Sequence, residues 1–447
     1  MANAGKLGSA LSSGGLGELK KRILFVILCL IVYRIGAHIS VPGVDSAALA
    51  KNFNHGGLLG LFDMFSGGAL SRYTIFALGV MPYITSSIIV QMFGTIHPKL
   101  QQLKKEGEAG KRKMNQYTRY GTVFLSLFQA IGMSKWISSM PGVVPMLNLS
   151  FYVTATMTLV TGTLFLMWLG EQITERGIGN GISLIIFASI VSRLPSAAAN
   201  VASQVHTGQM GVPTMLFVIV AVVAIVAVIV YIERAQRKIT IHYAKRMQGN
   251  KLYAGQTSHL PLKINMAGVI PTIFAQSIIA FPGLIATFFA KGNNFAWLSQ
   301  IALIFQPGQP LYMILIAVSV IFFSFFYTAL TFNPKETADN LKKSGAFIQG
   351  IRPGEQTAKY IDKVMTRLTV FGSLYLATIT LLPEFFTIWW GIPLLFGGTS
   401  LLIIVVVIMD FIAQVQAHLM SHQYESLMNR SDRKSGKKSG KMGLLKE

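Results

Sequence analysis

The stretch PTMLFVIVAVVAIVAVIVYI, residues 213–232, decides the fold class, because it holds twenty consecutive residues without a charged side chain. A helix of about 20 apolar residues is long enough to cross the hydrocarbon core of a bilayer. Similar runs recur along the 447 residues, of which 52% are hydrophobic and only 13% charged. The sequence therefore predicts an all-α integral membrane protein with ten transmembrane helices, at about residues 23–39, 74–94, 120–137, 151–170, 179–195, 213–232, 265–289, 311–332, 368–387 and 399–418.

Positive charge is distributed unevenly between the two sets of loops that these ten spans define. Thirty-three of the 39 lysines and arginines lie in the two tails, 1–22 and 419–447, or in the loops that follow the second, fourth, sixth and eighth spans. Cytoplasmic loops carry the excess of Lys and Arg in membrane proteins. We therefore expect a multi-pass membrane protein with both termini in the cytoplasm. Orientation accounts for the net charge of +22, although a basic face could also attract acidic lipids, a ribosome or an acidic motor protein.

Motifs of the common enzyme classes are missing from the sequence. Cys29 is the single cysteine, so that neither a disulfide within one chain nor a cysteine metal site is expected. The segment GEAGKR, residues 107–112, has the wrong spacing for a phosphate-binding loop and lacks its hydroxyl residue. The eight histidines are scattered, and neither H-E-x-x-H nor G-x-S-x-G occurs. The sequence predicts no catalytic residue, no metal and no cofactor.

A small-molecule secondary transporter is the main alternative function, and an intramembrane enzyme is the third. A proton-coupled transporter needs ionisable groups near the midplane of its spans, because a charge inside the membrane is costly unless it has a function. Arg34 and Asp410 are the only charges well inside the predicted spans, and each lies within two turns of an end. Snorkelling or an interhelical pair explains both, so that a passive channel is favoured.

Two segments are rich in residues that a simple membrane helix would not need. In ALGVMPYITSSIIVQMF, residues 77–93, Pro82 is expected inside an apolar helix and predicts a kink. In WLGEQITERGIGNGIS, residues 168–183, the glycines predict a tight turn that opens into the fifth span, where Ile182 and Ile186 share one face. Ordinary packing of helices through small residues is the alternative for both segments.

These two segments closely resemble the bacterial SecY family, the channel subunit of the Sec protein translocase, and the resemblance covers nearly the whole chain. It is supported further by GGLGELKKR at 14–22, MFSGGALSR at 64–72, LPLKINMAGVIP at 260–271, FNPKETADNLKKSGAFIQGIRPGEQTAKYID at 332–362 and FGGTSLLI at 396–403. The resemblance implies two inverted halves of five helices, 23–195 and 196–418, around a central pore that opens sideways between the second and seventh spans. It also implies a passive channel for unfolded secretory proteins that releases membrane segments into lipid, driven by a partner ATPase, the ribosome or the proton-motive force.

The resemblance places a hydrophobic constriction, the pore ring, on six residues that are each expected inside an apolar helix: Val80, Ile84, Ile182, Ile186, Ile273 and Ile403. A narrow apolar neck excludes ions because water leaves it, while its side chains yield to a passing polypeptide. Val80 stands where the family mostly has Ile, which predicts a slightly looser seal.

Below the ring, the resemblance makes residues 58–70 a plug, with Gly67 and Gly68 as its hinge. The plug residues are Leu58, Leu59, Leu61, Phe62, Met64, Phe65, Gly67 and Gly68. A half-helix that packs on lipid is the alternative for this apolar segment. At the side gate, the resemblance implies a polar cluster in which interhelical hydrogen bonds are remade, formed by Thr85, Gln129 and Asn265 beside Pro82.

Loops 233–263 and 333–367 are too long and too basic for simple turns, and the resemblance makes them the docking surface for the ribosome and the SecA motor ATPase. Arg352, in the turn Arg352-Pro353-Gly354, is the strongest candidate contact, followed by Arg237, Lys238, Lys245, Arg246 and Lys251. Asn250 stands beside Lys251 where relatives tend to carry two basic residues, a departure that weakens phosphate binding there. The implied partners are SecE, SecG, SecA, the ribosome, the unfolded preprotein with its signal peptide and the phospholipid bilayer, with contacts to YidC and SecDF.

Overall fold

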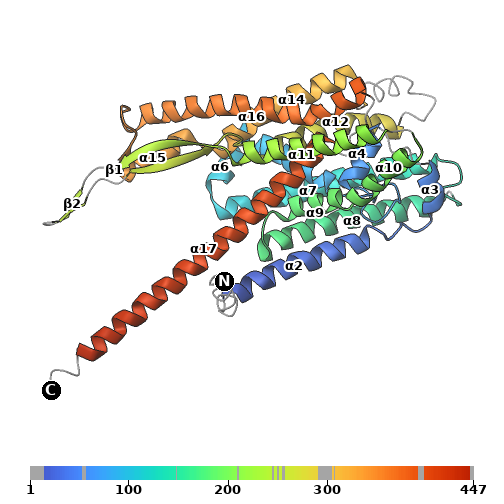
Figure 1. Ribbon diagram of the computed structural model, residues 1–447. Coiled ribbons are helices and arrows are strands. Elements are labelled where there is room, and N and C mark those ends of the chain that lie inside the picture. The colour runs from blue at the N-terminus through green and yellow to red at the C-terminus, as the bar shows by residue number, and fades with distance from the viewer. Residues whose placement is uncertain are drawn as a thin grey trace.

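A computed structural model describes residues 15–52, 57–146, 148–208, 211–243, 246–248, 251–253, 257–289, 305–306, 308–390 and 397–442. Its long helices run side by side (Figure 1). The start of α2, the end of α17, α15 and the β1 strand lie toward one end of the molecule, here called the basic end, while α3 and α10 lie at the opposite end.

Each of the ten predicted spans overlaps a helix in the described part of the chain. These helices are α2 (Gly15–Gly36), α5 (Met81–Ile96), α7 (Glu108–Ser138), α8 (Leu149–Arg176), α9 (Gly181–Val191), α11 (Val212–Arg234), α12 (Ile270–Phe289), α14 (Pro310–Thr331), α16 (Glu355–Trp390) and α17 (Gly398–Met442). By length and composition alone, six helical stretches among the described residues could cross a membrane: Leu149–Arg176, Gly181–His206, Val212–Arg234, Pro310–Lys343, Glu355–Phe386 and Gly398–Met420. The structure is therefore a multi-pass helical bundle.

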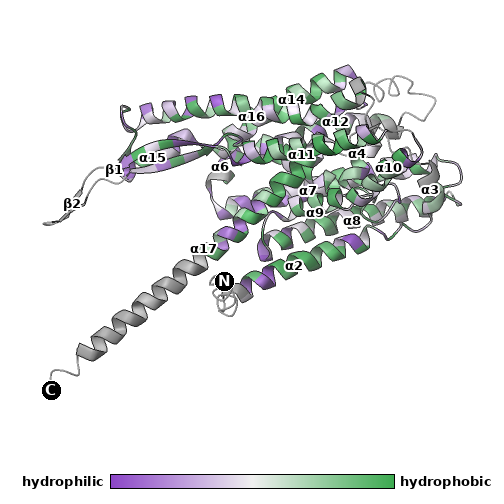
Figure 2. Ribbon diagram, viewed as in Figure 1, coloured by the Kyte–Doolittle hydropathy of each residue, from purple (hydrophilic) through white to green (hydrophobic). Residues whose placement is uncertain are grey.

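Apolar side chains cover the flanks of this bundle as well as its core (Figure 2). Leu24 on α2, Val223 on α11 and Phe371 on α16 are each more than 60% exposed. A soluble protein rarely exposes so large a continuous apolar surface, whereas lipid tails solvate it without cost. Inside, one hydrophobic cluster runs from Val26 and Tyr33 on α2 to Val406 on α17 and contains residues of most of the long helices.

Short helices and strands connect the long helices. The helices are α3 (Ser46–Asn52), α4 (Gly57–Phe65), α6 (Pro98–Lys105), α10 (Leu194–His206) and α15 (Pro334–Lys343). The strands are β1 (Gln236–Tyr243), β2 (Arg246–Gln248), β3 (Lys251–Tyr253), β4 (Thr257–Lys263) and β5 (Ala346–Phe347). The strands that the structure describes all lie in the two long loops predicted to dock partners, so that these loops are not all-α as predicted, although α15 lies in the second of them.

The two long loops form one structure, because β1 pairs antiparallel with β4 from its own loop and with β5 from the other. Ile239 lies opposite Leu260 in the hairpin, and His242 lies opposite Phe347. The buried face of the hairpin, Ile239 and Leu262, packs with Ile361 of α16 in a separate small core. This core anchors the loops to the helical bundle.

The second predicted span begins too early in the sequence. Residues 74–80 form turns, and α5 starts only at Met81. Pro82 therefore lies in the first turn of α5, where its missing N–H group is not needed by the helix. The predicted kink at Pro82 is wrong: this proline helps to start the helix. Within the described residues, the prolines that lie inside helices are Pro282 of α12 and Pro383 of α16.

The predicted glycine turn before the fifth span is confirmed. Gly179 adopts a left-handed φ of 92°, and Asn180 caps α9 by accepting hydrogen bonds from the N–H groups of Ile182 and Ser183. The Thr174 hydroxyl accepts a further bond from the N–H group of Gly181 at 2.8 Å. The turn is thereby tied to the end of α8 and aims α9 into the bundle.

Candidate channel constriction and plug

The six predicted ring residues lie in one hydrophobic cluster. Val80, Ile84, Ile186 and Ile403 are fully buried in it, while Ile182 and Ile273 are partly buried and pack against it. They come from α5, α9, α12 and α17, which are far apart in the sequence. The prediction that every ring residue lies inside a helix is wrong for Val80, which is the N-cap of α5.

A cavity of about 160 Å³ adjoins the ring, and Ile186, Ile273 and Ile403 contribute to its wall. Polar residues line it as well, namely Asn180 at the start of α9 together with Asp410 and Gln414 on α17. Asp410 and Gln414 follow Ile403 along α17 in the direction of the basic end. The cavity thus becomes more polar with distance from the ring, as a water-filled entrance above an apolar neck requires.

The predicted plug contains helix α4, which contacts α9 and α12 inside the bundle. Phe65 is buried, and Phe62 and Met64 are partly buried. This packing within the chain contradicts the alternative of a half-helix on lipid for the described part of the segment. The side chains of Leu58, Leu59 and Leu61 lie outside the described residues.

Gly67 and Gly68, the predicted hinge, follow α4 with left-handed φ angles of 70° and 83°. A side chain at Gly67 would begin 3.1 Å from the Cα atom of Ser189, so that the plug backbone approaches α9 more closely than another residue would allow. At Gly68, a side chain would point into open space. The two glycines therefore share a backbone conformation but differ in their surroundings.

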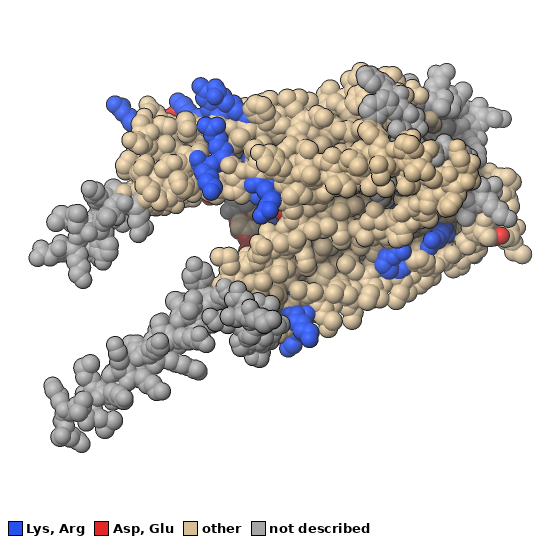
Figure 3. All heavy atoms as spheres, viewed as in Figure 1, with Lys and Arg blue, Asp and Glu red and all other residues tan. Residues whose placement is uncertain are grey.

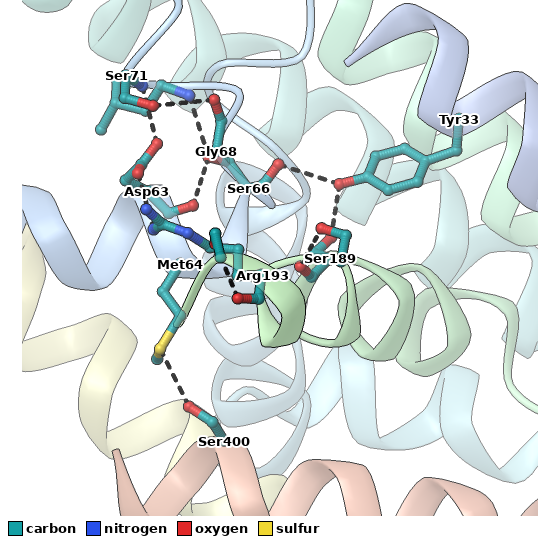
Figure 4. A network of polar contacts seen from close by, with 12 residues as sticks. Tyr33, Asp63, Met64, Ser66, Gly68, Ser71, Ser189, Arg193 and Ser400 are labelled. Carbon is teal, nitrogen blue, oxygen red and sulfur yellow. Dashed lines mark hydrogen bonds and ion pairs between the residues drawn. The ribbon is translucent and has the colours of Figure 1, made fainter. Parts of the chain in front are cut away.

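Sequence reasoning missed a polar network that surrounds the plug (Figure 4). Asp63 of α4 is fully buried, and its Oδ2 atom lies 2.7 Å from Nη1 of Arg193. Its other oxygen, Oδ1, accepts a hydrogen bond from the N–H group of Ser71 at 2.8 Å. A signal was available in the sequence: Asp63 is the single charge among residues 58–70, and Arg193 is the single basic residue among residues 193–212.

Three other elements complete the plug seat, which we define as Tyr33, Ser189, Arg193 and Ser400. The Tyr33 hydroxyl of α2 donates to the carbonyl of Ser66 at 3.1 Å and lies 2.6 Å from the Ser189 hydroxyl of α9. The Ser400 hydroxyl of α17 lies 3.3 Å from the sulfur of Met64. The plug therefore contacts polar groups from both the first and the last of the long helices.

The residues predicted for a side gate are buried, but their hydrogen bonds run elsewhere. The Thr85 hydroxyl donates to the carbonyl of Met81 on its own helix. The Asn265 amide donates to Oε1 of Glu233 at 2.6 Å and to the carbonyl of Gly268 at 3.1 Å. Gln129 is buried on α7. Thr85 and Gln129 thus lie on α5 and α7, while Asn265 precedes α12, and the described hydrogen bonds of Thr85 and Asn265 do not join the three residues into one cluster.

Helices α5 and α12, which would form the gate, contact each other. The Ser277 hydroxyl of α12 lies 3.9 Å from the sulfur of Met81 at the start of α5. Both helices also contact α7, and the Ser86 hydroxyl of α5 donates to the carbonyl of Thr118 on α7 at 2.7 Å. The contact between α5 and α12 is a weak sulfur contact, whereas α5 and α7 share a strong hydrogen bond.

The candidate docking residues that the structure describes are exposed at the basic end. Arg237 and Lys238 lie on β1, and Lys and Arg gather over this end on the face shown in Figure 3. Arg352 is exposed beside Gly350 and Gly354, both with left-handed φ angles, and its carbonyl accepts a hydrogen bond from the buried Thr357 at 2.9 Å. Lys245 and the side chains of Arg246 and Lys251 lie outside the described residues.

The chain is similar in sequence to proteins of one known family. The family model described as SecY matches residues 74–412. The protein translocase subunit SecY of Escherichia coli (strain K12) is 59% identical over 428 residues, covering 95% of this chain and 97% of the relative. Its counterpart in Vibrio cholerae is 57% identical over 429 residues, with 95% and 97% covered.

Solved structures support the same fold. A protein-conducting channel matches with a TM-score of 0.66 at 17% identity, covering 90% of this chain and 93% of the other. Sec61 in a canine ribosome-channel complex matches with a TM-score of 0.63 at 17% identity and the same coverage. With the family model matching well over half of the chain, and with relatives this similar along nearly all of it, the chain belongs to the SecY family of protein translocase subunits.

Proposed function

We propose that this chain forms a protein-conducting channel through which unfolded secretory proteins cross the bacterial inner membrane, with membrane segments released sideways into lipid. The observation that carries this proposal is the pore ring: six branched apolar side chains, on or next to α5, α9, α12 and α17, belong to one hydrophobic cluster beside a cavity whose polar residues lie on α9 and α17. A proton-coupled small-molecule transporter would instead need ionisable groups in the ring itself, and none of the six ring residues is ionisable.

In the proposed resting state, the ring keeps ions out because a narrow neck of Val and Ile side chains does not hold a continuous column of water. The plug lies against α9 and α12 and closes the neck from the side of α10. An arriving polypeptide displaces the plug and passes between side chains that offer no specific contacts. This lack of directed contacts supports passage of chains of almost any sequence.

The proposed architecture has ten transmembrane helices in two inverted halves, residues 23–195 and 196–418, with the tails 1–22 and 419–447 in the cytoplasm. The excess of positive charge at the basic end supports this orientation. We further propose that SecE and SecG assemble with the chain, that SecA or the ribosome docks at the basic end, and that SecA, the ribosome or the proton-motive force supplies the energy.

Reconstitution tests the proposed function directly. The purified chain with its two small partner subunits is placed in liposomes and supplied with the motor ATPase, ATP and an unfolded precursor. We expect the precursor to become protected from added protease. Lack of protection with a demonstrably active motor would contradict the proposal.

Docking at Arg352 has its own test. The side chain is presented on a rigid turn, and a guanidinium offers planar, two-pronged hydrogen bonding that an ammonium cannot reproduce. We expect Arg352→Glu to abolish motor-driven import and Arg352→Lys to weaken it, while insertion and resting conductance stay normal. If Arg352 served only to orient the chain, Lys would be silent, because the charge would be unchanged.

The side gate can be locked at the contact between Met81 and Ser277. In a chain whose native Cys29 is replaced by Ala, cysteines at these two positions are expected to form a disulfide under oxidation. Import should stop when the bond forms and resume after reduction. Full import by the crosslinked protein would exclude an opening between α5 and α12.

A further inference from the structure

A buried ion pair joins the plug to the segment between α9 and α10. The side chain of Asp63 is 0% exposed and that of Arg193 is 26% exposed, with 2.7 Å between Oδ2 and Nη1 (Figure 4). The remaining oxygen of Asp63 is held by the N–H group of Ser71. Of these two partners, Arg193 belongs to the plug seat, so that the ion pair exists only while α4 stays in its seat.

Each of the two charges lies at the unfavourable end of a helix. Asp63 is near the C-terminus of α4, where the helix dipole is negative, and Arg193 is the N-cap of α10, where the dipole is positive. Alone, each charge would destabilise its own helix end. Together they offset each other, which ties the stability of both helix ends to the closed position of the plug.

We infer that Asp63 and Arg193 form an electrostatic latch that keeps the plug closed and sets how readily it is displaced. The inference rests on the proposed function, in which α4 belongs to the plug. The other contacts of the seat that the structure describes are neutral: the hydroxyl bonds of Tyr33 and the contact of Ser400 with the Met64 sulfur. The ion pair therefore adds an electrostatic attraction between the plug and its seat, which the neutral contacts do not provide.

The unequal burial of the partners predicts unequal effects of removing them. Arg193→Gln removes a cation from a fully buried carboxylate, and the loss of an ion-pair partner from a buried charge is strongly unfavourable. The plug can relieve this by leaving its seat, so that Asp63 reaches water. Asp63→Asn leaves a guanidinium that is already partly exposed and can be solvated in place. The double variant Asp63→Asn/Arg193→Gln contains neither unpaired charge.

These unequal effects can be tested by the resting conductance of each variant in planar bilayers. The conductance is measured on the full chain without motor or precursor. We expect Arg193→Gln to raise resting conductance by at least about tenfold, Asp63→Asn by clearly less, and the double variant to return close to wild type. Arg72→Gln is the matched control, because Arg72 is also an arginine next to the plug but is exposed and has no ion pair within the described part of the chain.

The outcomes separate the latch from the proposed function. If the wild-type chain imports the precursor but Arg193→Gln conducts like wild type, the latch is overturned while the channel function stands. If the double variant leaks as much as Arg193→Gln, pairing of the charges is not what closes the plug. Failure of the wild type to import would overturn the proposed function itself. Should Arg193→Gln fail to insert, the double variant must restore both insertion and sealing, and a double variant that does not would also overturn the latch.

Discussion

The pore ring and the plug seat lie side by side but close the proposed channel by different kinds of contact. The ring consists only of Val and Ile side chains, which attract each other without directional preference. The seat joins the plug through hydroxyl groups, a carboxylate and a guanidinium with defined distances. An apolar ring tolerates a change of shape, whereas a polar seat either keeps its partners or leaves groups unsatisfied.

This difference suggests that the ring and the seat have different roles in the proposed channel. The ring can deform around a moving chain and close again, since its contacts are interchangeable. The seat holds one position of the plug, since its contacts are specific. At the ring, the polarity of a substituted side chain should therefore decide the resting conductance. At the seat, the geometry of the contacts should decide it.

Polar substitution of the ring should have the largest effect. In the double variant Ile186→Asn/Ile403→Asn, two buried apolar residues become hydrogen-bonding groups that retain water in the neck. We expect resting conductance in planar bilayers to rise about a hundredfold, on the basis of roughly 1–3 kcal/mol for each unsatisfied buried polar group. The matched control Ile186→Val/Ile403→Val removes one methylene at each site and should remain closed. Equal conductance of the two double variants would contradict the role of polarity.

Backbone geometry at the hinge gives the next effect. At either glycine, Ala would have to adopt the left-handed backbone conformation, which costs about 1–2 kcal/mol, but only at Gly67 does the new methyl group approach α9. We expect Gly67→Ala to raise resting conductance about tenfold and Gly68→Ala clearly less. The reaction of a water-soluble thiol reagent with a cysteine introduced into the plug, in a chain whose Cys29 is replaced by Ala, provides a second measurement. A larger effect at Gly68 would show that the plug does not rest on Ser189.

Loss of one hydroxyl from the seat should have a smaller effect. Tyr33→Phe keeps the aromatic packing against Phe76 but removes the donor to the carbonyl of Ser66. A net loss of about 1 kcal/mol predicts roughly a fivefold rise in resting conductance. Because Tyr33 also bonds Ser189, combining Tyr33→Phe with Ser189→Ala should be less than additive. Full additivity would mean that the two hydroxyls do not share one network.

Enlarging the ring should have the smallest effect. Val80→Ile adds one methylene to a buried position beside Ile84. A buried methylene contributes about 0.8 kcal/mol, so that resting conductance should fall by at most about fourfold. Thermal unfolding in detergent checks that the larger side chain fits. A rise in conductance would instead indicate that the position is already filled.

Family resemblance predicted the ring. Ile186, Ile273 and Ile403 lie in separate helices and line one cavity, and their role as the neck of a pore stays a prediction. The prediction for Pro82 failed because an apolar run does not mark where a helix starts. Residues 74–80 are apolar enough for a span, yet they form largely buried turns in which Gly79 adopts a left-handed φ of 58°.

Sequence alone determined the membrane class, the approximate helices and the uneven distribution of charge, because a bilayer requires long apolar runs and basic flanking loops whatever the packing. Only the tertiary structure decided which polar groups meet. Asp63 and Arg193 are separated in the described part of the chain by five complete helices, namely α5, α6, α7, α8 and α9, and nothing in their local sequence specifies a partner. The pairing of β5 with β1 is likewise set by the packing of two distant loops against α16. Contacts of this kind depend on how the helices are arranged, and hydropathy carries no information about that arrangement.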